Sequence, residues 1–156
     1  MKKISFCFTI LVMTSLMMTA CAGGPSQNKA PEFSGALGRD WQLVKIRTET
    51  GGINLDRTVM EAEGIGDAFT LQFEENQING KALPNRYFGP YTRKGQSINF
   101  QGIASTLMAS FKELDVLTER EYFDYLERVQ SWAWNQDSLE LHSSTPDGQK
   151  AILIFQ

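Results

Sequence analysis

The chain of 156 residues carries 15 Lys+Arg against 18 Asp+Glu, which gives a formal net charge of −3, and it contains two cysteines. This acidic balance, without a basic patch, argues against a protein that holds nucleic acid through its phosphates. The length allows one folded domain with a single hydrophobic core.

The N-terminal segment has the pattern of an export signal. Met1-Lys2-Lys3 is positively charged, Ile4 to Met18 is apolar, and Met18-Thr19-Ala20-Cys21 ends in small residues before a cysteine. This order is typical of a cleaved signal peptide. The alternative is an uncleaved membrane helix, but the apolar run is shorter than the ~20 residues that a span requires.

With Cys21 directly after the cut site, the segment resembles a bacterial lipoprotein signal. The resemblance implies that residues 1–20 are removed and that Cys21 carries an S-diacylglycerol and an N-acyl chain. Ala22 stands where enteric bacteria have an aspartate that retains lipoproteins in the inner membrane. We therefore expect the cell outer membrane, with the domain facing the periplasm; the alternative is the outer face of the cytoplasmic membrane.

Cleavage would change the charge and the cysteine count. Loss of Lys2 and Lys3 lowers Lys+Arg from 15 to 13 against 18 acidic residues, so the net charge becomes −5. Cys7 is lost with the signal, which leaves Cys21 alone and excludes a disulfide within the mature chain.

A tether is predicted between the signal and the folded part. Ala22 to about Leu37 is small, polar and proline-containing, which is typical of a flexible linker. About 16 such residues span roughly 20–24 Å. The expected organisation is therefore a signal peptide (1–20), a lipidated tether (21–38) and one domain (39–156).

Most of the domain is predicted to consist of short strands. Residues 41–46 read as the first strand, and 48–66 as a Gly-rich loop with a turn of helix near 57–63. Phe69, Leu71 and Phe73 alternate with polar residues, the period of a half-buried strand. Further strands are expected at 77–79, 85–92, 97–101, around 132–134, at 139–141 and at 151–155.

One amphipathic helix is predicted before the last three strands. Thr118 and Glu121 have capping-box spacing, and the apolar residues that follow recur at helical intervals: Tyr122, Phe123, Leu126 and Val129. Short strands with one such helix predict an α+β fold. We expect a single small domain, an antiparallel sheet or incomplete β-barrel packed on one main α-helix.

Several segments resemble a known family. Residues 85–91 are close to the pattern N-x-[YF]-x-G-x-Y, residues 104–109 are similar to A-[ST]-T-x-M-A, and Trp41 to Val44 is like W-x-L. In this order they resemble the META domain of HslJ-like bacterial lipoproteins. The segment 56–66 is an insert in the common pattern.

The resemblance implies a small envelope-associated or secreted α+β domain, and the family provides no catalytic residues that could be assigned to positions in this chain. In some bacteria the family is linked to heat shock and antibiotic tolerance. Its relatives are similar to a type III secretion pilotin, which gives the alternative of a pilotin-like assembly factor for a secretion component.

The sequence contains few candidates for catalytic or metal-binding residues. His142 is the only histidine, and alternation with Leu139 and Leu141 places it on the solvent side of its strand. No nucleophile, base and acid set is visible around it, so we expect a protein that is not an enzyme; a hidden hydrolase that uses His142 is the alternative. No Cys/His cluster offers a metal site, and we expect no cofactor.

The aromatic residues leave two interpretations open. Tyr87, Tyr91, Met108, Trp132 and Trp134 form either part of the core or a surface for an acyl chain or a partner peptide. The expected function is a non-catalytic envelope lipoprotein that binds a partner protein or hydrophobic ligand, or supports stress tolerance. Its lipid anchor would make the membrane a partner, and no nucleic acid is expected.

Overall fold

The computed structural model describes residues 32–109 and 114–156. In chain order their elements are η1 (Phe33–Ala36), β1 (Trp41–Thr48), β2 (Gly52–Asn54), α1 (Arg57–Ala62), β3 (Thr70–Phe73), β4 (Gln77–Lys81), β5 (Arg86–Lys94), β6 (Ser97–Phe100), β7 (Ala104–Ser105), α2 (Glu119–Glu127), β8 (Ser131–Asn135), β9 (Ser138–Ser144) and β10 (Lys150–Phe155). Each strand expected from periodicity is present. The elements η1, β2 and β7 were not predicted.

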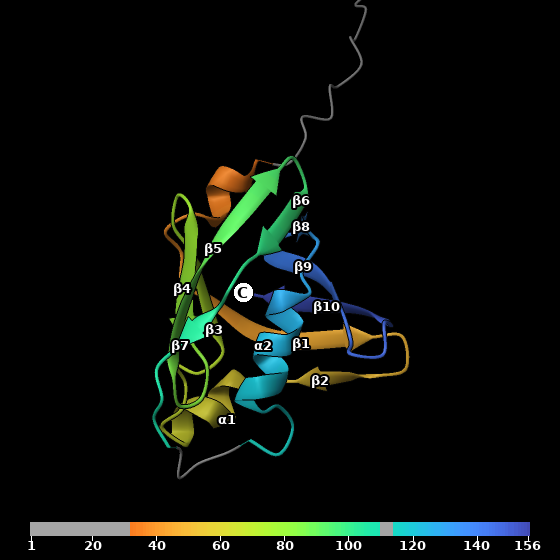
Figure 1. The fold of residues 1–156 in the computed structure, drawn as a ribbon. Helices are drawn as coiled ribbons and strands as arrows, with labels where there is room; N and C mark the ends of the chain where they lie inside the picture. Colours follow the sequence, from red (N-terminus) through yellow and green to blue (C-terminus); the bar gives the residue numbers. More distant parts are fainter. Residues whose placement is uncertain (1–31, 110–113) are drawn as a thin grey trace, which may run out of the picture. The chain divides into compact units, whose positions relative to one another are not determined.

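Eight antiparallel strands close into a barrel (Figure 1). They pair in the order β1–β3–β4–β5–β6–β8–β9–β10, and β10 pairs back with β1 from Leu43↔Phe155 to Thr48↔Ala151. The two short strands extend from this ring, β2 from β1 and β7 from β5. Because the first and last strands pair, the main sheet has no free edge within the ring.

The expected sheet or incomplete barrel packed on one main α-helix is therefore wrong. The ring is closed, and the helices are short, with 6 residues in α1 and 9 in α2. Local periodicity identified the strands, but it carries no information on which strands pair. The pairing of β1 with β10 joins residues more than 100 positions apart, and this pairing decides the fold class.

The ring has one narrow junction, between β6 and β8. These strands share only the pair Ser97↔Ser131, whereas β8 and β9 share five pairs. The helix α2 packs against β6 and β9 beside this junction and turns Tyr122 and Leu126 into the interior. Its N-terminus has the predicted capping box of Thr118 and Glu121.

Short segments cover the two ends of the barrel, and Figure 1 shows η1 (orange) and α1 at opposite ends. At one end, Phe33 of η1 is buried and its ring lies 4.9 Å from that of Trp132. At the other end, Met60 and Ile65 are buried. Residues 33–37 thus belong to the folded unit although they were expected in the tether, and the 56–66 insert supplies part of the core.

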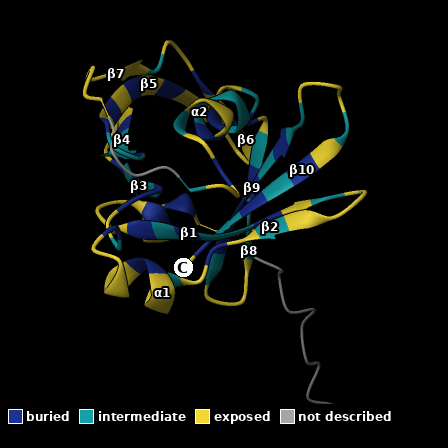
Figure 2. Ribbon diagram, turned by 90° about the horizontal axis from the view of Figure 1, so that it is seen from below, coloured by how far each residue is buried: buried dark blue, intermediate teal, exposed yellow. Residues whose placement is uncertain are grey.

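Large side chains fill the interior. An eight-stranded barrel is just wide enough for its inward side chains to meet. Here aromatic rings do so in edge-to-face contacts, such as Phe33 with Phe73 at 5.0 Å and Phe73 with Tyr91 at 5.5 Å between centroids. In Figure 2 the buried residues (dark blue) lie along the strands, while most of α1 and the hairpin tips are exposed.

One polar cluster lies inside this apolar core. The Tyr87 hydroxyl donates to the main-chain oxygen of Thr70 at 2.7 Å, and the Tyr122 hydroxyl contacts the same oxygen at 3.2 Å and Tyr87 at 3.1 Å. Burial raises the pKa of Tyr87 and of Tyr122 well above the ordinary tyrosine value. The cluster connects α2 with β3 and β5 through groups that stay protonated.

The cluster requires a glycine at position 80. A Cβ there would lie 2.1 Å from the Thr70 oxygen and 2.7 Å from the Tyr87 hydroxyl. Next to Gly80, the Lys81 amide donates to the Thr70 side chain at 3.1 Å instead of to a main-chain oxygen. The Thr70 carbonyl is therefore free to accept from the two tyrosines.

We predict that Gly80→Ala lowers the free energy of unfolding by about 2–3 kcal/mol, because the new methyl group has no space and main-chain atoms must move. Urea denaturation of the variant and the parent measures this. Gly51→Ala is the control, since nothing lies within 4 Å of its Cβ position. Equal losses in both variants would contradict the packing explanation.

We also predict an alkaline loss of stability that depends on Tyr122. A tyrosine whose pKa is raised by folding stabilises the fold fully below the unfolded pKa of about 10, and this contribution falls as the pH rises further. Tyr122→Phe removes one such group, so the free energy of unfolding should fall less steeply above pH 10 than in the parent. Tyr125→Phe is the comparison variant: burial also raises the pKa of Tyr125, but this residue is only half-buried, so we expect a smaller change in slope than for Tyr122→Phe. An unchanged slope in Tyr122→Phe would refute the prediction.

Candidate functional site

The residues considered for a hydrophobic surface do not gather on one exposed face. Tyr87, Tyr91 and Trp132 are buried, with exposures of 1%, 9% and 2%, whereas Met108 is 60% exposed. Trp134 is half-buried. The three buried residues are part of the core, which was the other interpretation of the sequence.

The two tryptophans of β8, Trp132 and Trp134, lie side by side. Their ring centroids are 6.1 Å apart. The segment before β1 covers them: Trp134 donates to the main-chain oxygen of Glu32 at 3.1 Å, and Phe33 packs on Trp132. The surface that an acyl chain would need at this point is occupied by the protein's own chain.

The predicted lipid attachment at Cys21 lies outside the described residues, as does the signal at 1–20. Among residues 32–109 and 114–156, no helix has both the length and the apolar character to cross a bilayer. Within the same ranges, no group of three or more His, Cys, Asp or Glu side chains is placed to hold a metal ion.

His142 lies on the outer side of β9. Its side chain is 42% exposed, and its Nε2 atom lies 3.6 Å from Glu140. Glu140 is in turn 3.6 Å from Arg47 and accepts from Asn135 at 2.9 Å. Among the described residues, the Nε2 atom of His142 has no hydrogen-bond partner, and its charged neighbours are the buried Glu140 and, through Glu140, Arg47.

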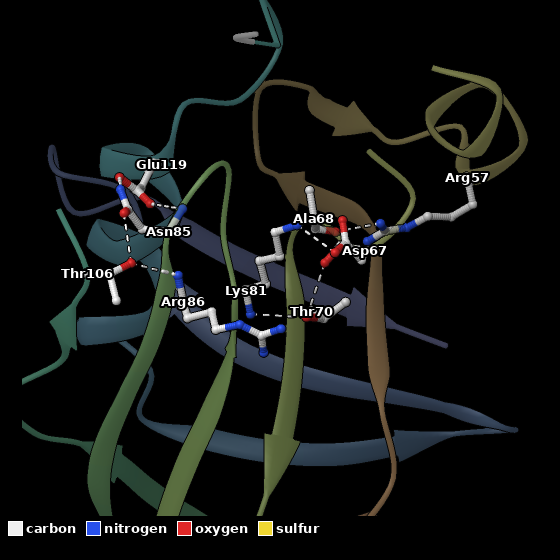
Figure 3. Close-up of polar contacts among 9 residues, drawn as sticks. All are labelled: Arg57, Asp67, Ala68, Thr70, Lys81, Asn85, Arg86, Thr106 and Glu119. Carbon is white, nitrogen blue, oxygen red and sulfur yellow. Dashed lines mark hydrogen bonds and ion pairs between the residues drawn. The ribbon is translucent and has the colours of Figure 1, made fainter. Parts of the chain in front are cut away.

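Asn85, the first residue of the motif at 85–91, organises a network shown in Figure 3. Its side-chain nitrogen donates to Glu119 at 2.9 Å and to the Met108 main-chain oxygen at 3.4 Å. Its side-chain oxygen accepts from Thr106 at 2.8 Å and from the Met108 amide at 2.7 Å. One buried amide therefore connects β5, the segment after β7 and the start of α2.

This network joins the two segments that resemble the family pattern. Asn85 comes from the first motif, Thr106 and Met108 from the second, and Glu119 from the first turn of α2. A carboxylate at a helix N-terminus is also favoured by the helix dipole. The contacts of these residues connect separate segments of the domain.

Arg57, in the insert, makes a second set of main-chain contacts. Its guanidinium donates to the oxygens of Ala68 at 2.7 Å and Phe69 at 3.1 Å, and also to Leu43. Burial lowers the pKa of Arg57 from its ordinary value. Phe69 has a left-handed backbone with φ of 53°, and Arg57 holds this irregular entry to β3 against β1.

A hollow lies on the outer face of β3 and β4, and we call it the β3–β4 hollow. Its volume is about 540 Å³, and its lining includes Asp40, Gln42, Glu61, Asp67, Lys81 and Arg86. Lys81 is paired with Asp67 at 2.5 Å. Figure 3 shows Lys81 reaching toward Asp67 and Arg86 extending across the sheet toward Thr70.

The sequence did not predict this hollow, nor the hydrogen-bond networks of Asn85 and Arg57. Asn85 and Arg57 are single polar residues whose partners are far along the chain, so no local spacing indicated them. The alternation within β5 was a usable signal for the outer face: it buries Tyr87 and Tyr91 and leaves Arg86 and Phe88 outside.

We predict that Asn85→Ala lowers the free energy of unfolding by about 2–3 kcal/mol, because it removes the acceptor of the Met108 amide and leaves Glu119 with only the main-chain amide of residue 85 as a partner. Chemical denaturation measures this loss. Asn99→Ala, at an exposed strand position, is the control and should change stability by less than about 0.5 kcal/mol. A similar result for both variants would mean that the network contributes little.

Comparison with known proteins agrees with this geometry. The structure is similar to the NMR structure of a protein from Burkholderia xenovorans, with a TM-score of 0.57, 17% identity, and 84% of this chain and 94% of the other covered. It is also similar to a crystal structure of a DUF4847 family protein from Bacteroides vulgatus, with a TM-score of 0.53, 14% identity, and coverage of 79% and 94%. These likenesses concern the fold.

Curated protein sequences gave no match. The family model of the META domain matches residues 33–155, a range that starts at the buried Phe33 and ends at the last core residue of β10. The match covers every described strand and confirms the resemblance found in the motifs at 85–91 and 104–109. The chain belongs to the META domain family.

Proposed function

We propose that this protein is a lipid-anchored, non-catalytic binding domain of the bacterial envelope. The observation that carries the proposal is the N-terminal order of Lys2-Lys3, an apolar run and Met18-Thr19-Ala20-Cys21. Two or three acyl chains on Cys21 would make membrane attachment stable, since each buried methylene contributes ~0.8 kcal/mol. Outer-membrane delivery, facing the periplasm, follows from Ala22.

The described residues support binding rather than catalysis. The Nε2 atom of His142 has no hydrogen-bond partner among these residues, and the inward tyrosines are engaged with each other and with Thr70. The aromatic interior is packed, and η1 covers Trp132 and Trp134. These features favour a protein that works through its outer surface, on a partner protein or another molecule of the envelope.

The pilotin-like role stays a prediction. Copurification of a secretin or another membrane ring with the full-length chain would support it. Support of the envelope under stress is likewise a prediction, and a deletion strain that grows as well as its parent under heat and cell-wall antibiotics would argue against it.

We predict that Cys21→Ser abolishes lipid attachment. Cells of a two-membrane host that express the full chain are fed an alkyne-tagged fatty acid, and the protein is then isolated and coupled to a dye. The parent should be labelled and found in the outer-membrane fraction, whereas Cys21→Ser should be unlabelled and keep its signal or leave the membrane.

Cys7→Ser is the matched control for this experiment, because it changes the other cysteine within the apolar run. It should be labelled like the parent. Labelling that persists in Cys21→Ser, or a parent protein without label, would refute the lipid anchor. In an enteric host, Ala22→Asp should move the labelled protein to the inner membrane.

A further inference from the structure

The outer face of β1, β3, β4 and β5 holds several polar side chains without partners among the described residues. Gln42 and Gln72, both half-buried, and Arg86, which is exposed, line the β3–β4 hollow. None of these three side chains hydrogen-bonds or ion-pairs with a described residue. Asn79 uses its side-chain nitrogen on Glu74 at 2.9 Å and keeps its oxygen available. Donors and acceptors of neutral amides are thus presented together.

An exposed aromatic ring stands beside these amides. Phe88 is 59% exposed, although it lies in the middle of β5. In the sheet register Phe88 pairs with Asn79, and Asn79 pairs with Gln72 on the next strand. One row across three strands therefore presents an aromatic ring followed by two amides.

The charges around the hollow do not favour a strongly charged ligand. Lys81 and Asp67 neutralise each other at 2.5 Å. Arg86 then faces Asp40 and Glu61 across the same hollow, so cationic and anionic groups are both present. An anion such as phosphate would meet two carboxylates, and a cation would meet Arg86. A neutral ligand rich in hydroxyl groups meets no such penalty.

We propose that the β3–β4 hollow and Phe88 together bind a linear, uncharged oligosaccharide that lies across β5, β4 and β3. The apolar face of one sugar ring packs on Phe88, where its C–H groups contact the aromatic ring. Hydroxyl groups of the neighbouring sugars exchange hydrogen bonds with Asn79, Gln72 and Gln42. This assignment names a ligand class for the outer surface and in that sense rests on the proposed function.

The test is isothermal titration of the full-length chain, purified in detergent from whichever fraction contains it, with two tetrasaccharides. Chitotetraose carries acetamido groups, and cellotetraose is its counterpart without them. We expect saturable binding of at least one of them. Saturable binding of chitotetraose alone would assign acetamido-bearing glycans, and binding of both would assign the β-1,4-linked backbone. Absence of saturable binding for both sugars at millimolar concentration would overturn the proposal.

Variants locate the site. Phe88→Ala and Gln72→Ala should each weaken binding at least tenfold, and thermal melting checks that both remain folded. Leu107→Ala is the matched control, because Leu107 is 98% exposed and lies outside the hollow. Binding that survives Phe88→Ala and Gln72→Ala, or that is lost equally in Leu107→Ala, would also overturn the proposal.

The outcome is separable from that of the proposed function. Titration measures the sugar site whether or not Cys21 is acylated, and fatty-acid labelling measures the anchor whether or not a sugar binds. An unlabelled protein that binds a tetrasaccharide would refute the anchor and keep the site. A labelled protein that binds neither sugar would keep the anchor and refute the sugar site.

Discussion

Pairing of the first strand with the last closes this domain, and the rest of the structure depends on that closure. β1 pairs with β10 along one side and with β3 at its start, so residues from both ends of the domain lie in adjacent strands. A ring of eight strands encloses a volume that side chains can fill. The aromatic core, the single polar cluster and the coverings at both ends are consequences of filling that volume without leaving a free edge.

The elements were largely predictable, but their assembly was not. Alternation marked Phe69, Leu71 and Phe73 as inward residues, and capping-box spacing marked the start of α2 at Thr118. These signals depend on neighbours within a few residues. Closure depends on the pairing of β1 with β10, whose residues are far apart in the sequence. Such a long-range contact leaves no signal in the local sequence pattern. For the same reason the expectation was an antiparallel sheet or an incomplete β-barrel packed on one main α-helix, and closure of the ring was not foreseen.

The candidate functional residues show the same limit of prediction from local sequence. Sequence reasoning grouped the aromatic residues of β5 and β8 without deciding between core and groove. The structure separates them by strand parity: Tyr87 and Tyr91 point inward and Phe88 outward. Asn85 appeared in a motif, yet its four side-chain contacts come from segments 21 to 34 residues away. In this chain Asn85 therefore marks a structural junction between β5, the segment after β7 and the start of α2.

The position of η1 has a mechanical consequence. Phe33 is held between Trp132 and Phe73, and the Gly38 amide donates to the Phe73 oxygen at 2.9 Å. Any pulling force applied to the chain before Glu32 reaches these contacts before it reaches β1. In a protein tethered at its N-terminal side, η1 would therefore be the first part of the fold to bear the force.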